Sequence, residues 1–502
     1  MGKAECYLGT DIGTSACKTI VISSSGDTLA QSSKDYWATT DKNGRAEIIP
    51  DEWFGAFLHT LKDSCKKASI SPADISGIGI TGQMVTLICF DKDGNYLRPA
   101  ILWYDSRGYE QLNRLSSDSK DLIRRITYNP INATFTLPKL LWVKENEPEI
   151  FKRIYMLLWS CDYIRMRLTG SGSYFTDMTN ASATLMYDIK SKVWSDDITG
   201  ILGIPKNILP DVLPAKNVIG KVNSNASAIT GLKRGTPVIV GTGDIGADNV
   251  AAGVLKDNQC SIRFSTCATI SVCLDEPLMD LDDKCPCSAH SLENLFLMQG
   301  TSASFGPCQR WIRDTFYSRD SSTENGYDIM ENEVSQVMQD NSDLFFHSFT
   351  KAAPYWNEKL KGQFVGIEPY HVRGHFTKAL YEGISYDLKT AILNLKKIKG
   401  VRIPEEIFII GGATRNNFLC NIVSNVMGYN FKKMKEADAA FGVAVLAWIG
   451  INNISDYEEI LKRFMKYSGN INYDHNSKDL YEKKYIIFKK IHNNLKEILN
   501  YW

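Results

Sequence analysis

The chain has 502 residues, which favours two domains because this length exceeds what one ordinary hydrophobic core accommodates. Its composition, 44% hydrophobic and 23% charged, is that of a globular protein and excludes an intrinsically disordered chain. Lys plus Arg and Asp plus Glu both number 57, so no net charge favours nucleic acid or an anionic membrane, and we expect a small partner.

The first 90 residues combine strand patterns with one helix pattern. Residues 51–67 have helical periodicity, since Trp53, Phe57 and Leu61 fall on one stripe. The strand patterns are short, apolar and bounded by turn residues; they cover residues 6–10, 18–23, 28–36, 75–81 and 85–90. This order predicts an α/β domain.

The rest of the chain repeats this organisation after a helix-rich stretch from 105 to 235, which includes helices at 139–143 and 162–168. Further strands are predicted at 236–241, 260–264, 269–273 and 406–410, and further helices at 246–255, up to 426, at 437–450 and at 479–500. The strand–turn–strand at 260–273 echoes the amino terminus, as an ancient duplication would. The last helix is amphipathic and is expected to pack back onto the fold.

Twelve cysteines are scattered along the chain without a C-x-x-C pair. This pattern supports neither a disulfide framework nor a zinc ribbon, and it favours reduced thiols in a cytosolic protein. No apolar run reaches the length of a membrane span. We therefore expect a soluble, cytoplasmic protein.

The stretch Y-L-G-T-D-I-G-T-S at 7–15 places an acid between two glycines after the first strand. Gly9 and Gly13 are expected to take positive φ in a tight turn, and backbone N–H groups in such a turn can bind an anion. Thr14 and Ser15 add hydroxyl donors, and Asp11 can hold magnesium directly or through water. A hairpin with an Asx-type turn is the structural alternative.

A second acid lies among glycines in G-T-G-D-I-G at 241–246, between a strand and a helix. This is formally a dinucleotide fingerprint, but the acid expected about 20 residues later to hold a ribose is missing. Asp244 is better explained as a working carboxylate that accepts a hydroxyl proton. Asp248 is a rival for this role or a second metal acid, unless it only complements the helix dipole.

A third glycine turn, Gly411-Gly412-Ala413, follows the strand I-F-I-I and precedes Asn416. Glycines here let the backbone approach a flat or charged ligand, and the next helix directs its amino end at it. The chain has no G-x-x-x-x-G-K-[ST] motif, which excludes a P-loop kinase.

In this order the motifs resemble the FGGY carbohydrate kinases, and most closely the xylulokinases among them. The likeness covers nearly the whole chain, and many stretches in the right order are more specific than any one of them. The stretches are Y-L-G-T-D-I-G-T-S (7–15), A-E-I-I-P-D-E-W (46–53), G-I-T-G-Q-M (79–84), R-P-A-I-L-W-Y-D-S-R (98–107), T-L-P-K-L-L-W-V (136–143), C-D-Y-I-R-M-R-L-T-G (161–170), G-T-G-D (241–244), G-Q-F-V-G-I (362–367) and G-G-A-T-R-N-N-F-L (411–419).

The resemblance implies an α/β fold of two actin-like ATPase (ribonuclease H-like) domains with an interdomain cleft. Residues 1–250 would form the sugar-binding domain and residues 251–502 the nucleotide-binding domain, with the helix at 479–500 packing on either lobe. The implied activity is transfer of the γ-phosphoryl group of MgATP to a ketose hydroxyl, D-xylulose to D-xylulose 5-phosphate being the leading case. The expected partners are thus a sugar, ATP and Mg²⁺, with no nucleic acid or membrane, and a homodimer is left open.

The resemblance also assigns roles to individual residues. Asp244 matches the catalytic base, and Asp11 matches the acid that faces magnesium and the phosphates, so both acids are expected near the metal. The sugar-binding residues would be Gln83, Met84, Val85, Trp103, Asp105, Arg107, Asp244 and Ile245. The nucleotide-binding residues would be Gly13, Thr14, Ser15, Thr266, Gly306, Gly411, Gly412 and Asn416. Two structural alternatives stay open: packing alone for Trp103, and an ion pair between Asp105 and Arg107.

Three departures from the pattern of these kinases bear on function. Xylulokinases usually read G-Q-M-H and G-D-N, whereas this chain has Val85 and Ile245 at the last positions. A hydrogen bond lost to a polyol changes discrimination by on the order of 10²-fold or more, so the substrate can be a less hydroxylated or branched relative of xylulose. In the turn R-F-S-T-C-A-T, Ser265 and Ala268 carry β-carbons where the family has glycine.

These departures motivate a second hypothesis of another class. The first is an ATP-dependent kinase of a ketose or polyol; the second is a non-catalytic actin-like relative that binds sugar or nucleotide and regulates another process. Intact Asp11, Asp244 and the Gly-Gly-Ala turn favour the kinase.

Overall fold

The computed structural model describes residues 5–41, 44–170, 172, 174–302, 304–317, 326–348, 361–435 and 437–499. The contacts within this chain divide it into two compact units. The first unit comprises Met1–Asp257, Cys273–Met298 and Glu436–Lys466, and the second comprises Asn258–Val272, Gln299–Lys435 and Tyr467–Trp502. Each unit is therefore assembled from segments that are distant in the sequence.

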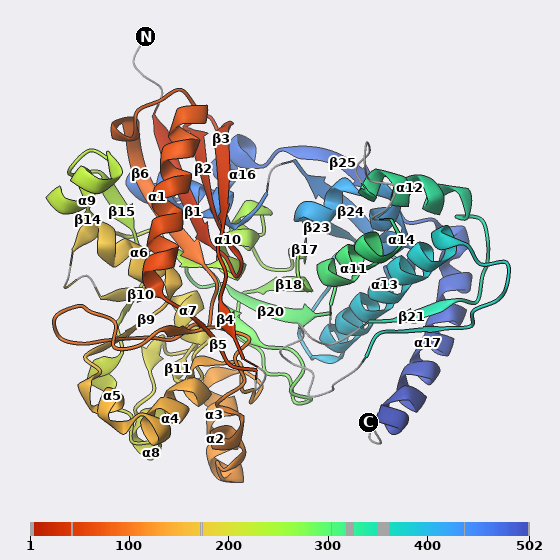
Figure 1. Cartoon of the computed structure of the whole chain (residues 1–502), viewed down its shortest axis with the longest axis horizontal. Coiled ribbons are helices and arrows are strands. Elements are labelled where there is room, and N and C mark those ends of the chain that lie inside the picture. Colours follow the sequence, from red (N-terminus) through yellow and green to blue (C-terminus); the bar gives the residue numbers. More distant parts are fainter. Residues whose placement is uncertain are drawn as a thin grey trace. The chain divides into compact units, whose positions relative to one another are not determined.

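The first unit is built on a mixed sheet (Figure 1). Its strands are β1 (Cys6–Ile12), β2 (Ala16–Ser23), β3 (Thr28–Asp35), β6 (Ile75–Gly82), β14 (Val218–Lys221), β15 (Pro237–Ile239) and β16 (Thr242–Gly243). The order is β14-β15-β6-β1-β2-β3, and β16 continues beside β6. Strands β1, β15 and β16 run parallel to β6, whereas β2, β3 and β14 are antiparallel to their neighbours. Parallel neighbours bring their carboxyl ends to one edge of the sheet.

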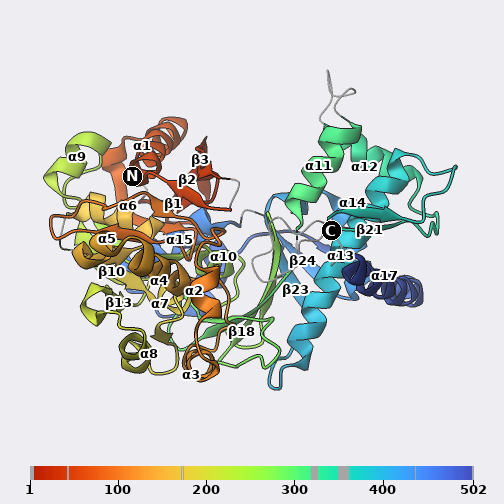
Figure 2. The ribbon, with the colours of Figure 1, turned by 60° about the horizontal axis from the view of Figure 1, so that its bottom comes forward.

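Helices cover both faces of this sheet. On one face, α1 (Pro50–Lys67) and α6 (Ser160–Thr169) share a buried apolar cluster with Leu8, and Thr60 of α1 bonds to Thr19 at 2.7 Å. On the other face lies α15 (Ala439–Ile451), which Figure 2 shows beside β1 and on which α10 (Asp244–Ala251) packs. Side chains alternate along a strand, so Asp11 points to the same face as Gly9, which is the α15 face.

Close packing of α15 explains glycines in the strands beneath it. A Cβ added at Gly9 would collide with the carbonyl oxygen of Ala440, and one at Gly79 would collide with that of Val443. A helix backbone can approach a strand this closely only where the strand lacks side chains. A segment near the end of the chain thus completes the core of the amino-terminal sheet.

Shorter elements complete the first unit. The strands are β4 (Thr39–Thr40), β5 (Ala46–Ile48), β7 (Ile88–Phe90), β8 (Ala100–Ile101), β9 (Met156–Leu158), β10 (Phe175–Asp177), β11 (Tyr187–Asp188), β12 (Val193–Trp194) and β13 (Asp211–Leu213). The helices are α2 (Tyr109–Asn113), α3 (Ser117–Thr127), α4 (Thr136–Asn146), α5 (Pro148–Arg153), α7 (Met178–Ser182), α8 (Asp196–Ile201), α9 (Ser224–Thr230) and α16 (Tyr457–Phe464). As the sequence predicted, helices dominate between residues 105 and 235.

The second mixed sheet repeats the strand order of the first. Its strands are β17 (Cys260–Phe264), β18 (Ala268–Leu274), β19 (Cys287–Ala289), β20 (Phe296–Thr301), β23 (Glu406–Ile410), β24 (Asn430–Met434) and β25 (Tyr467–Ile471). The order β25-β24-β23-β17-β18-β20-β19 places a parallel trio, β24, β23 and β17, beside an antiparallel hairpin. The same arrangement of β15, β6, β1 and β2 in the first sheet agrees with the predicted echo.

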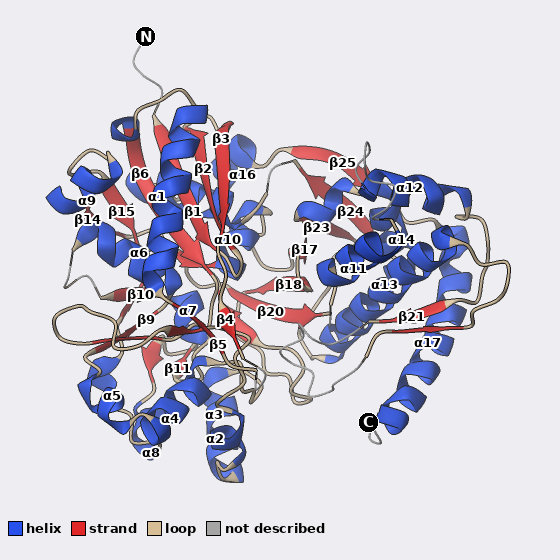
Figure 3. Ribbon diagram, viewed as in Figure 1, coloured by secondary structure: helices blue, strands red, loops and turns tan. Residues whose placement is uncertain are grey.

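The second unit also contains α-helices and a two-stranded hairpin, and Figure 3 distinguishes helices from strands. These elements are α11 (Gly306–Phe316), α12 (Gly326–Gln336), α13 (Arg373–Lys397), α14 (Asn417–Met427), α17 (Lys478–Leu499), and the hairpin of β21 (Phe345–His347) and β22 (Gln363–Val365). Helix α17 packs on α13 and α14, so the amphipathic terminal helix belongs to the second unit; residue 500, its expected end, lies outside the described residues. The two α/β halves confirm the expected fold class.

The state of the cysteines agrees with the expectation of reduced thiols. All twelve cysteines lie in the described part of the chain, and each is a buried free thiol. Burial raises the pKa of most of them, for example that of Cys89 to about 12, so these thiols are unreactive. Within the described ranges, no helix combines the length and the apolar character needed to cross a bilayer.

Candidate active site

Three strands of the first unit end side by side, with β6 between β1 and β16. In this register Thr81 pairs with Asp11 on one side and with Thr242 on the other. Neighbouring strands lie about 4.8 Å apart, so the Cα atoms of Asp11 and Thr242 are about 10 Å apart. Asp244 follows Thr242 by two residues. The two acids that the sequence singled out therefore emerge at one edge of one sheet.

Glycines allow this edge to close tightly. A Cβ at Gly82 would lie 2.7 Å from Ser160 Oγ and 2.9 Å from the carbonyl oxygen of Ile12. A Cβ at Gly243 would lie 2.5 Å from Cγ of Met84. The predicted sugar residue Met84, which is buried, thus lies directly over the residue that precedes Asp244.

Asp244 is the first residue of α10, and its Oδ1 accepts a hydrogen bond from the N–H of Ile245 at 3.0 Å. The amino end of a helix carries unsatisfied N–H groups and a partial positive charge, which favour a carboxylate there. Asp244 and Ile245 are half-buried, whereas Asp248 is only 4% exposed. Of the two acids weighed as the base, Asp244 is thus the one that a substrate can approach.

A buried polar network supports the strand before Asp244. The Thr242 hydroxyl donates to Asp177 at 2.6 Å and lies 2.9 Å from Ser291 Oγ. Asp177 also accepts from the side-chain amide of Asn180 at 2.8 Å, and it is 1% exposed. These bonds fix the direction in which β16 enters α10.

An ion pair continues this network behind the strand. Arg165 pairs with Asp162 at 2.8 Å, both side chains are 1% exposed, and Arg165 also donates to the carbonyl oxygens of Val240 and Phe175. Burial raises the pKa of Asp162, while the charge of Arg165 opposes the shift. The pair joins β15 to β10, so the backbone leading to Asp244 is held on both sides.

The turn between β1 and β2 is braced from outside the hairpin. Gly13 N donates to Ala16 O at 3.0 Å, and Gly13 O accepts from the Tyr36 hydroxyl and from Gln83 Nε2, the latter at 3.1 Å. Ser15 is exposed, and its carbonyl accepts from the N–H of Tyr36 at 3.1 Å. The turn is therefore held rigidly while a hydroxyl stays open to solvent.

Thr14 receives a bond from a predicted sugar residue. Trp103 Nε1 donates to Thr14 Oγ1 at 2.8 Å, and the Trp103 ring meets Tyr104 edge-on with centroids 5.4 Å apart. Packing is therefore only part of what Trp103 does, because its indole N–H fixes the hydroxyl of the first turn.

The expectation that Gly9 and Gly13 take positive φ is wrong. Neither glycine has a left-handed backbone. Gly9 lies inside β1, where glycine is needed by the approach of α15, and a Cβ at Gly13 would lie 3.0 Å from Ala16 O. The turn has little room for a side chain at Gly13 because the carbonyl oxygen of Ala16 is so close.

The left-handed residue of this region is Val85, with φ 54°. A β-branched side chain in this conformation is strained, so the surrounding structure must impose it. It also shortens the strand predicted from residue 85, because β7 begins only at Ile88. The buried Lys139 of α4 donates from Nζ to the carbonyl oxygen of Val85 at 2.8 Å and so holds the turn.

Asp105 and Arg107 pair with each other, which was the structural alternative. Arg107 bonds to Asp105 at 2.7 and 2.9 Å and to Glu47 at 2.7 Å. The side chain of Asp105 is fully buried, that of Arg107 is 2% exposed, and Asp105 also accepts from the N–H of Ala46 at 2.6 Å. These charges support the loop that carries Trp103, and their predicted contact with a sugar has no geometric support.

In the second unit, the turn between β17 and β18 is closed by its own Ser265 and by the start of α11. The hydroxyl of Ser265 donates to Cys267 O at 2.8 Å, and Phe305 and Gly306 donate their N–H groups to Thr266 O at 2.9 Å and to Ser265 O at 3.0 Å. The exposed Thr266 and the first residue of α11, Gly306, thus lie side by side as the sequence suggested.

Ser265 and Ala268 have no left-handed backbone, so this turn does not require the glycines that the family carries there. Ala268 is already in β18, paired with Phe264. Neither residue is therefore strained by a left-handed backbone conformation.

The Gly-Gly-Ala turn follows β23. Gly411 has φ 102°, and a Cβ there would collide with the carbonyl oxygen of Phe264, so glycine is obligatory. At Gly412, no atom among the described residues lies within 4 Å of the position a Cβ would take. Asn416 caps α14 by accepting from Leu419 N at 2.7 Å and donates to the Tyr381 hydroxyl at 3.0 Å, which gives it a structural role.

The predicted residues fall into two groups, one in each unit. The first unit brings together Asp11, Gly13, Thr14, Ser15, Gln83, Met84, Val85, Trp103, Asp244 and Ile245. The second unit brings Thr266, Gly306, Gly411, Gly412 and Asn416 to the ends of β17 and β23. The sequence missed Lys139, Tyr36 and Asp177, although a lone lysine in the apolar run L-P-K-L-L-W-V is a signal that could have been read.

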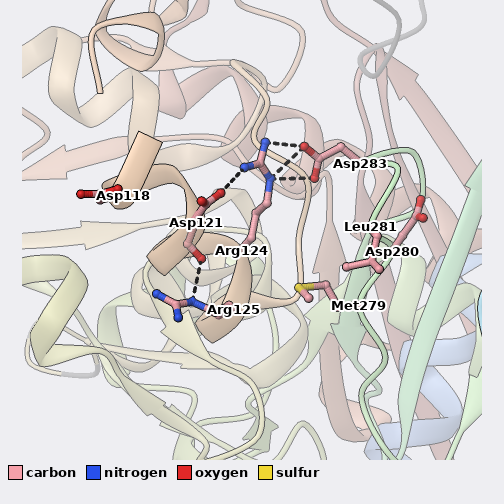
Figure 4. A pocket seen from close by; sticks show the side chains of 8 residues that line it. All are labelled: Asp118, Asp121, Arg124, Arg125, Met279, Asp280, Leu281 and Asp283. Atoms are coloured by element: carbon pink, nitrogen blue, oxygen red, sulfur yellow. Dashed lines mark hydrogen bonds and ion pairs between the residues drawn. The ribbon is translucent and has the colours of Figure 1, made fainter. Parts of the chain in front are cut away.

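A pocket of about 600 Å³ in the first unit lies apart from these residues (Figure 4). It is formed by α3 and by the loop that follows β18, and its lining residues are Asp118, Asp121, Arg124, Arg125, Met279, Asp280, Leu281 and Asp283. Arg124 pairs with Asp121 and with Asp283 at 2.9 Å and 2.5 Å. Arg124, Asp121 and Asp283 thus pair with one another and stabilise the loop.

Comparison with known proteins agrees with this geometry. Residues 6–251 match the N-terminal domain of the FGGY family of carbohydrate kinases, and residues 266–451 match its C-terminal domain. The chain belongs to the FGGY family of carbohydrate kinases, as its motifs indicated, and it is a sugar kinase.

The most similar relatives include several kinds of sugar kinase. The xylulose kinase of Bacillus subtilis is 28% identical over 98% of this chain and 97% of its own length. A crystal structure of ligand-bound xylulose kinase from Lactobacillus acidophilus has a TM-score of 0.87 at 25% identity, covering 98% of each chain. A structure of gluconate kinase from the same organism has the same TM-score and identity, covering 98% of this chain and 99% of its own.

Proposed function

We propose that this chain phosphorylates D-xylulose to D-xylulose 5-phosphate with MgATP, in the cytoplasm. The observation that carries the proposal is the convergence of Asp11 and Asp244 on one edge of the first sheet, where the Cα atoms of Asp11 and of Thr242, two residues before Asp244, are about 10 Å apart by strand spacing. This separation leaves room for a phosphoryl group and an acceptor hydroxyl between two carboxylates. The similarity to xylulose kinases over 98% of the chain supports the choice of sugar.

Asp244 takes the role of general base. It sits at the amino end of α10, where it is accessible. A carboxylate of this kind accepts the proton of the attacking hydroxyl as the bond to phosphorus forms. Placement matters more than tuning here, because an aspartate is already ionised at neutral pH.

Asp11 and Asp244 are the residues that would hold Mg²⁺. Two carboxylates suit this ion, which usually keeps several waters and takes its remaining ligands from substrate phosphates. This agrees with the finding that no cluster of three or more metal-ligating side chains occurs among the described residues. When bound, the ion would neutralise charge on the phosphates.

Each unit has one turn whose groups suit a phosphate. The braced turn at Gly13–Ser15 offers backbone N–H groups and two hydroxyls, and the turn at Thr266 offers a third hydroxyl. The open space at Gly412 suits the approach of a flat nucleotide to the backbone. Binding donor and acceptor together excludes water, which would otherwise compete as the phosphoryl acceptor.

A different acceptor is the second candidate. Val85 and Ile245 present apolar groups where xylulokinases have polar ones, and Val85 cannot donate to a sugar hydroxyl. A gluconate kinase is structurally as similar to this chain as a xylulose kinase is. A ketose or polyol with one fewer hydroxyl at this point would fit these side chains.

The test is a sugar panel in an assay of ADP release. D-xylulose, D-ribulose, D-fructose, xylitol, glycerol and gluconate are compared by kcat/KM, and ³¹P NMR identifies the hydroxyl that is phosphorylated. We expect the largest kcat/KM with D-xylulose and phosphorylation at its 5-hydroxyl. Protein carrying Asp244→Asn, prepared in the same way, controls for contaminating kinases.

Two outcomes would overturn the proposal. A kcat/KM at least about tenfold higher for another acceptor than for D-xylulose would move the chain to that sugar, since tenfold corresponds to about 1.4 kcal/mol of transition-state binding. ADP release that no sugar stimulates, while ATP still binds, would contradict sugar phosphorylation altogether.

A further inference from the structure

Lys139 of α4 is fully buried, yet nothing in the proposed chemistry uses it. Its Nζ donates to three carbonyl oxygens: to Val85 O at 2.8 Å, to Trp103 O at 3.4 Å, and to Thr134 O. An ammonium group has three N–H donors and no acceptor, so these three oxygens satisfy it completely. Burying a charge is costly unless it is paired or fully hydrogen-bonded, so a lysine at this position needs a compensating role.

Two of the three carbonyls belong to the loops that carry the proposed sugar residues. One loop contains Gln83, Met84 and the left-handed Val85, and the other contains Trp103. Neither carbonyl belongs to a strand, so no sheet ladder fixes its direction. A backbone bridge already joins the two segments at Leu87 and Ile101, with N–H···O distances of 2.9 and 3.0 Å. Beyond this bridge, the lysine joins the irregular residues Val85 and Trp103.

Both loops also reach the turn between β1 and β2. Gln83 Nε2 donates to Gly13 O at 3.1 Å, and Trp103 Nε1 donates to Thr14 Oγ1 at 2.8 Å. Hydrogen bonds thus connect the lysine, through both loops, to the turn next to Asp11.

We propose that Lys139 is a positioning residue for the acceptor sugar: it ties the backbone of Val85 to that of Trp103, so that both loops present their side chains as one surface. This inference rests on the sugar-binding role of these loops in the proposed function, whichever sugar is the acceptor. Burial lowers the pKa of Lys139 to about 7, with Asp105 opposing the shift and Arg107 adding to it.

The chain offers a matched control in Lys378 of α13. This lysine is 6% exposed, and its Nζ also donates to three carbonyl oxygens, those of Val337, Met338 and Asp340. Burial lowers its pKa as well. It has the same chemistry as Lys139, but it lies in the second unit and holds none of the proposed sugar loops.

The experiment compares Lys139→Met with Lys378→Met, using the acceptor with the highest kcat/KM in the sugar panel. We expect Lys139→Met to raise the sugar KM by about 10- to 100-fold, as a small misplacement of contacts does, with a smaller change in kcat. Lys378→Met should lower thermal stability and leave the sugar KM within about twofold. A sugar KM that is unchanged in Lys139→Met, or raised equally in Lys378→Met, would overturn the inference.

Hydrogen exchange gives a readout that does not depend on activity. In Lys139→Met, amide exchange should rise together in peptides covering residues 83–87 and 102–105, because one tie holds both segments. Lys139→Gln, which retains two N–H donors, should give an intermediate effect and keeps the test available if the methionine variant fails to fold. Exchange that rises in neither peptide, or in only one, would contradict the tie. Failure of D-xylulose as substrate changes only the sugar used, so the two proposals fail separately.

Discussion

The two sheets have the same strand order, but their hairpin turns are held in different ways. In the first unit, the turn at Gly13 and Thr14 is braced by side chains from elsewhere: Tyr36, Gln83 and Trp103. In the second unit, the turn at 265–267 is closed by the hydroxyl of Ser265 and by the amino end of α11. The same topology thus has one turn braced by distant side chains and one turn closed by its own hydroxyl and by backbone N–H groups at the start of α11.

This difference in how the two turns are held indicates that the turns have different roles. Bracing connects the first turn to the loops proposed to hold the sugar, so a change at the sugar loops will be felt at the phosphates. The second turn is closed by Ser265 and by α11, which carries none of the proposed sugar residues, and near it Gly412 leaves space for a ligand. We therefore expect the first turn to affect both substrates and the second to affect the nucleotide alone.

The largest effect of a substitution is expected at Asp244. Asp244→Asn removes the proposed base and should lower kcat by about 10²- to 10⁴-fold, the range for general-base catalysis, while sugar binding measured by calorimetry stays within about twofold. Asp248→Asn is the matched control and should have a much smaller effect, since Asp248 is 4% exposed. Turnover that survives in Asp244→Asn and is lost in Asp248→Asn would move the base by one helical turn.

The paired glycines of the second unit sharpen the comparison through stability. Gly411→Ala should lower the free energy of unfolding by about 2–4 kcal/mol, because a left-handed φ of 102° and a collision with Phe264 O both oppose the new Cβ. Gly412→Ala should change it by less than about 0.5 kcal/mol. If the nucleotide occupies this space, Gly412→Ala raises the ATP KM about tenfold, as overpacking by a methyl group would. An unchanged ATP KM in Gly412→Ala would place the nucleotide elsewhere.

The two units should also respond to acid in opposite directions. In the first unit, burial lowers the pKa of His290 to about 4; its Nε2 bonds to Val254 O at 3.0 Å and its Nδ1 accepts from Leu292 N. Because the unfolded histidine titrates near 6.5, the stability due to neutral His290 is present above pH 6.5 and is lost as the pH falls through about 4, by up to about 3 kcal/mol. In the second unit, burial raises the pKa of Asp387 to about 7, so its contribution is present below about pH 4 and is lost as the pH rises through 7.

Urea unfolding of His290→Gln and Asp387→Asn beside the wild type, from pH 4 to 8, measures both contributions. The difference between wild type and His290→Gln should shrink as the pH falls, and that between wild type and Asp387→Asn should shrink as it rises. Parallel pH profiles for either variant and the wild type would contradict the shift assigned to that residue.

The smallest effects are expected at the two turns themselves. Thr14→Val removes the acceptor of the Trp103 indole N–H and should cost about 1 kcal/mol of stability together with about a tenfold rise in ATP KM. Thr266→Val, at an exposed residue, should leave stability within about 0.5 kcal/mol and raise the ATP KM by about threefold. Equal effects of both changes on the sugar KM would show that the two turns do not differ in function.

Much of the fold could be predicted because local patterns decide it. The bounds of β17 and β23 coincide with the apolar runs read from the sequence, and α1 differs by one residue at its start. The repeat of strand–turn–strand was also visible. Where prediction failed, the cause was non-local: Gly9 is glycine because a helix from the far end of the chain packs on it.

The candidate site was predicted in part for the same reason. Asp11 and Asp244 stand out because acids among glycines at strand ends are rare patterns. The left-handed Val85 leaves no local signature, and the lone lysine in the apolar run does not show that it contacts Val85, because that residue lies 54 positions away. The pairing of Arg107 with Glu47 likewise became visible only once β5 and β8 were adjacent.

The place of α15 has a consequence for biosynthesis. When the ribosome has produced β1 and β6, the helix that covers Gly9 and Gly79 has still to be made, and at about 5–20 residues per second it follows roughly 20–75 s later. Throughout that interval the nascent amino-terminal half exposes an apolar sheet face, and a fragment that stops before residue 439 would retain this defect permanently. Heterologous expression of the amino-terminal half alone should therefore yield aggregates unless a segment spanning α15 is supplied in trans.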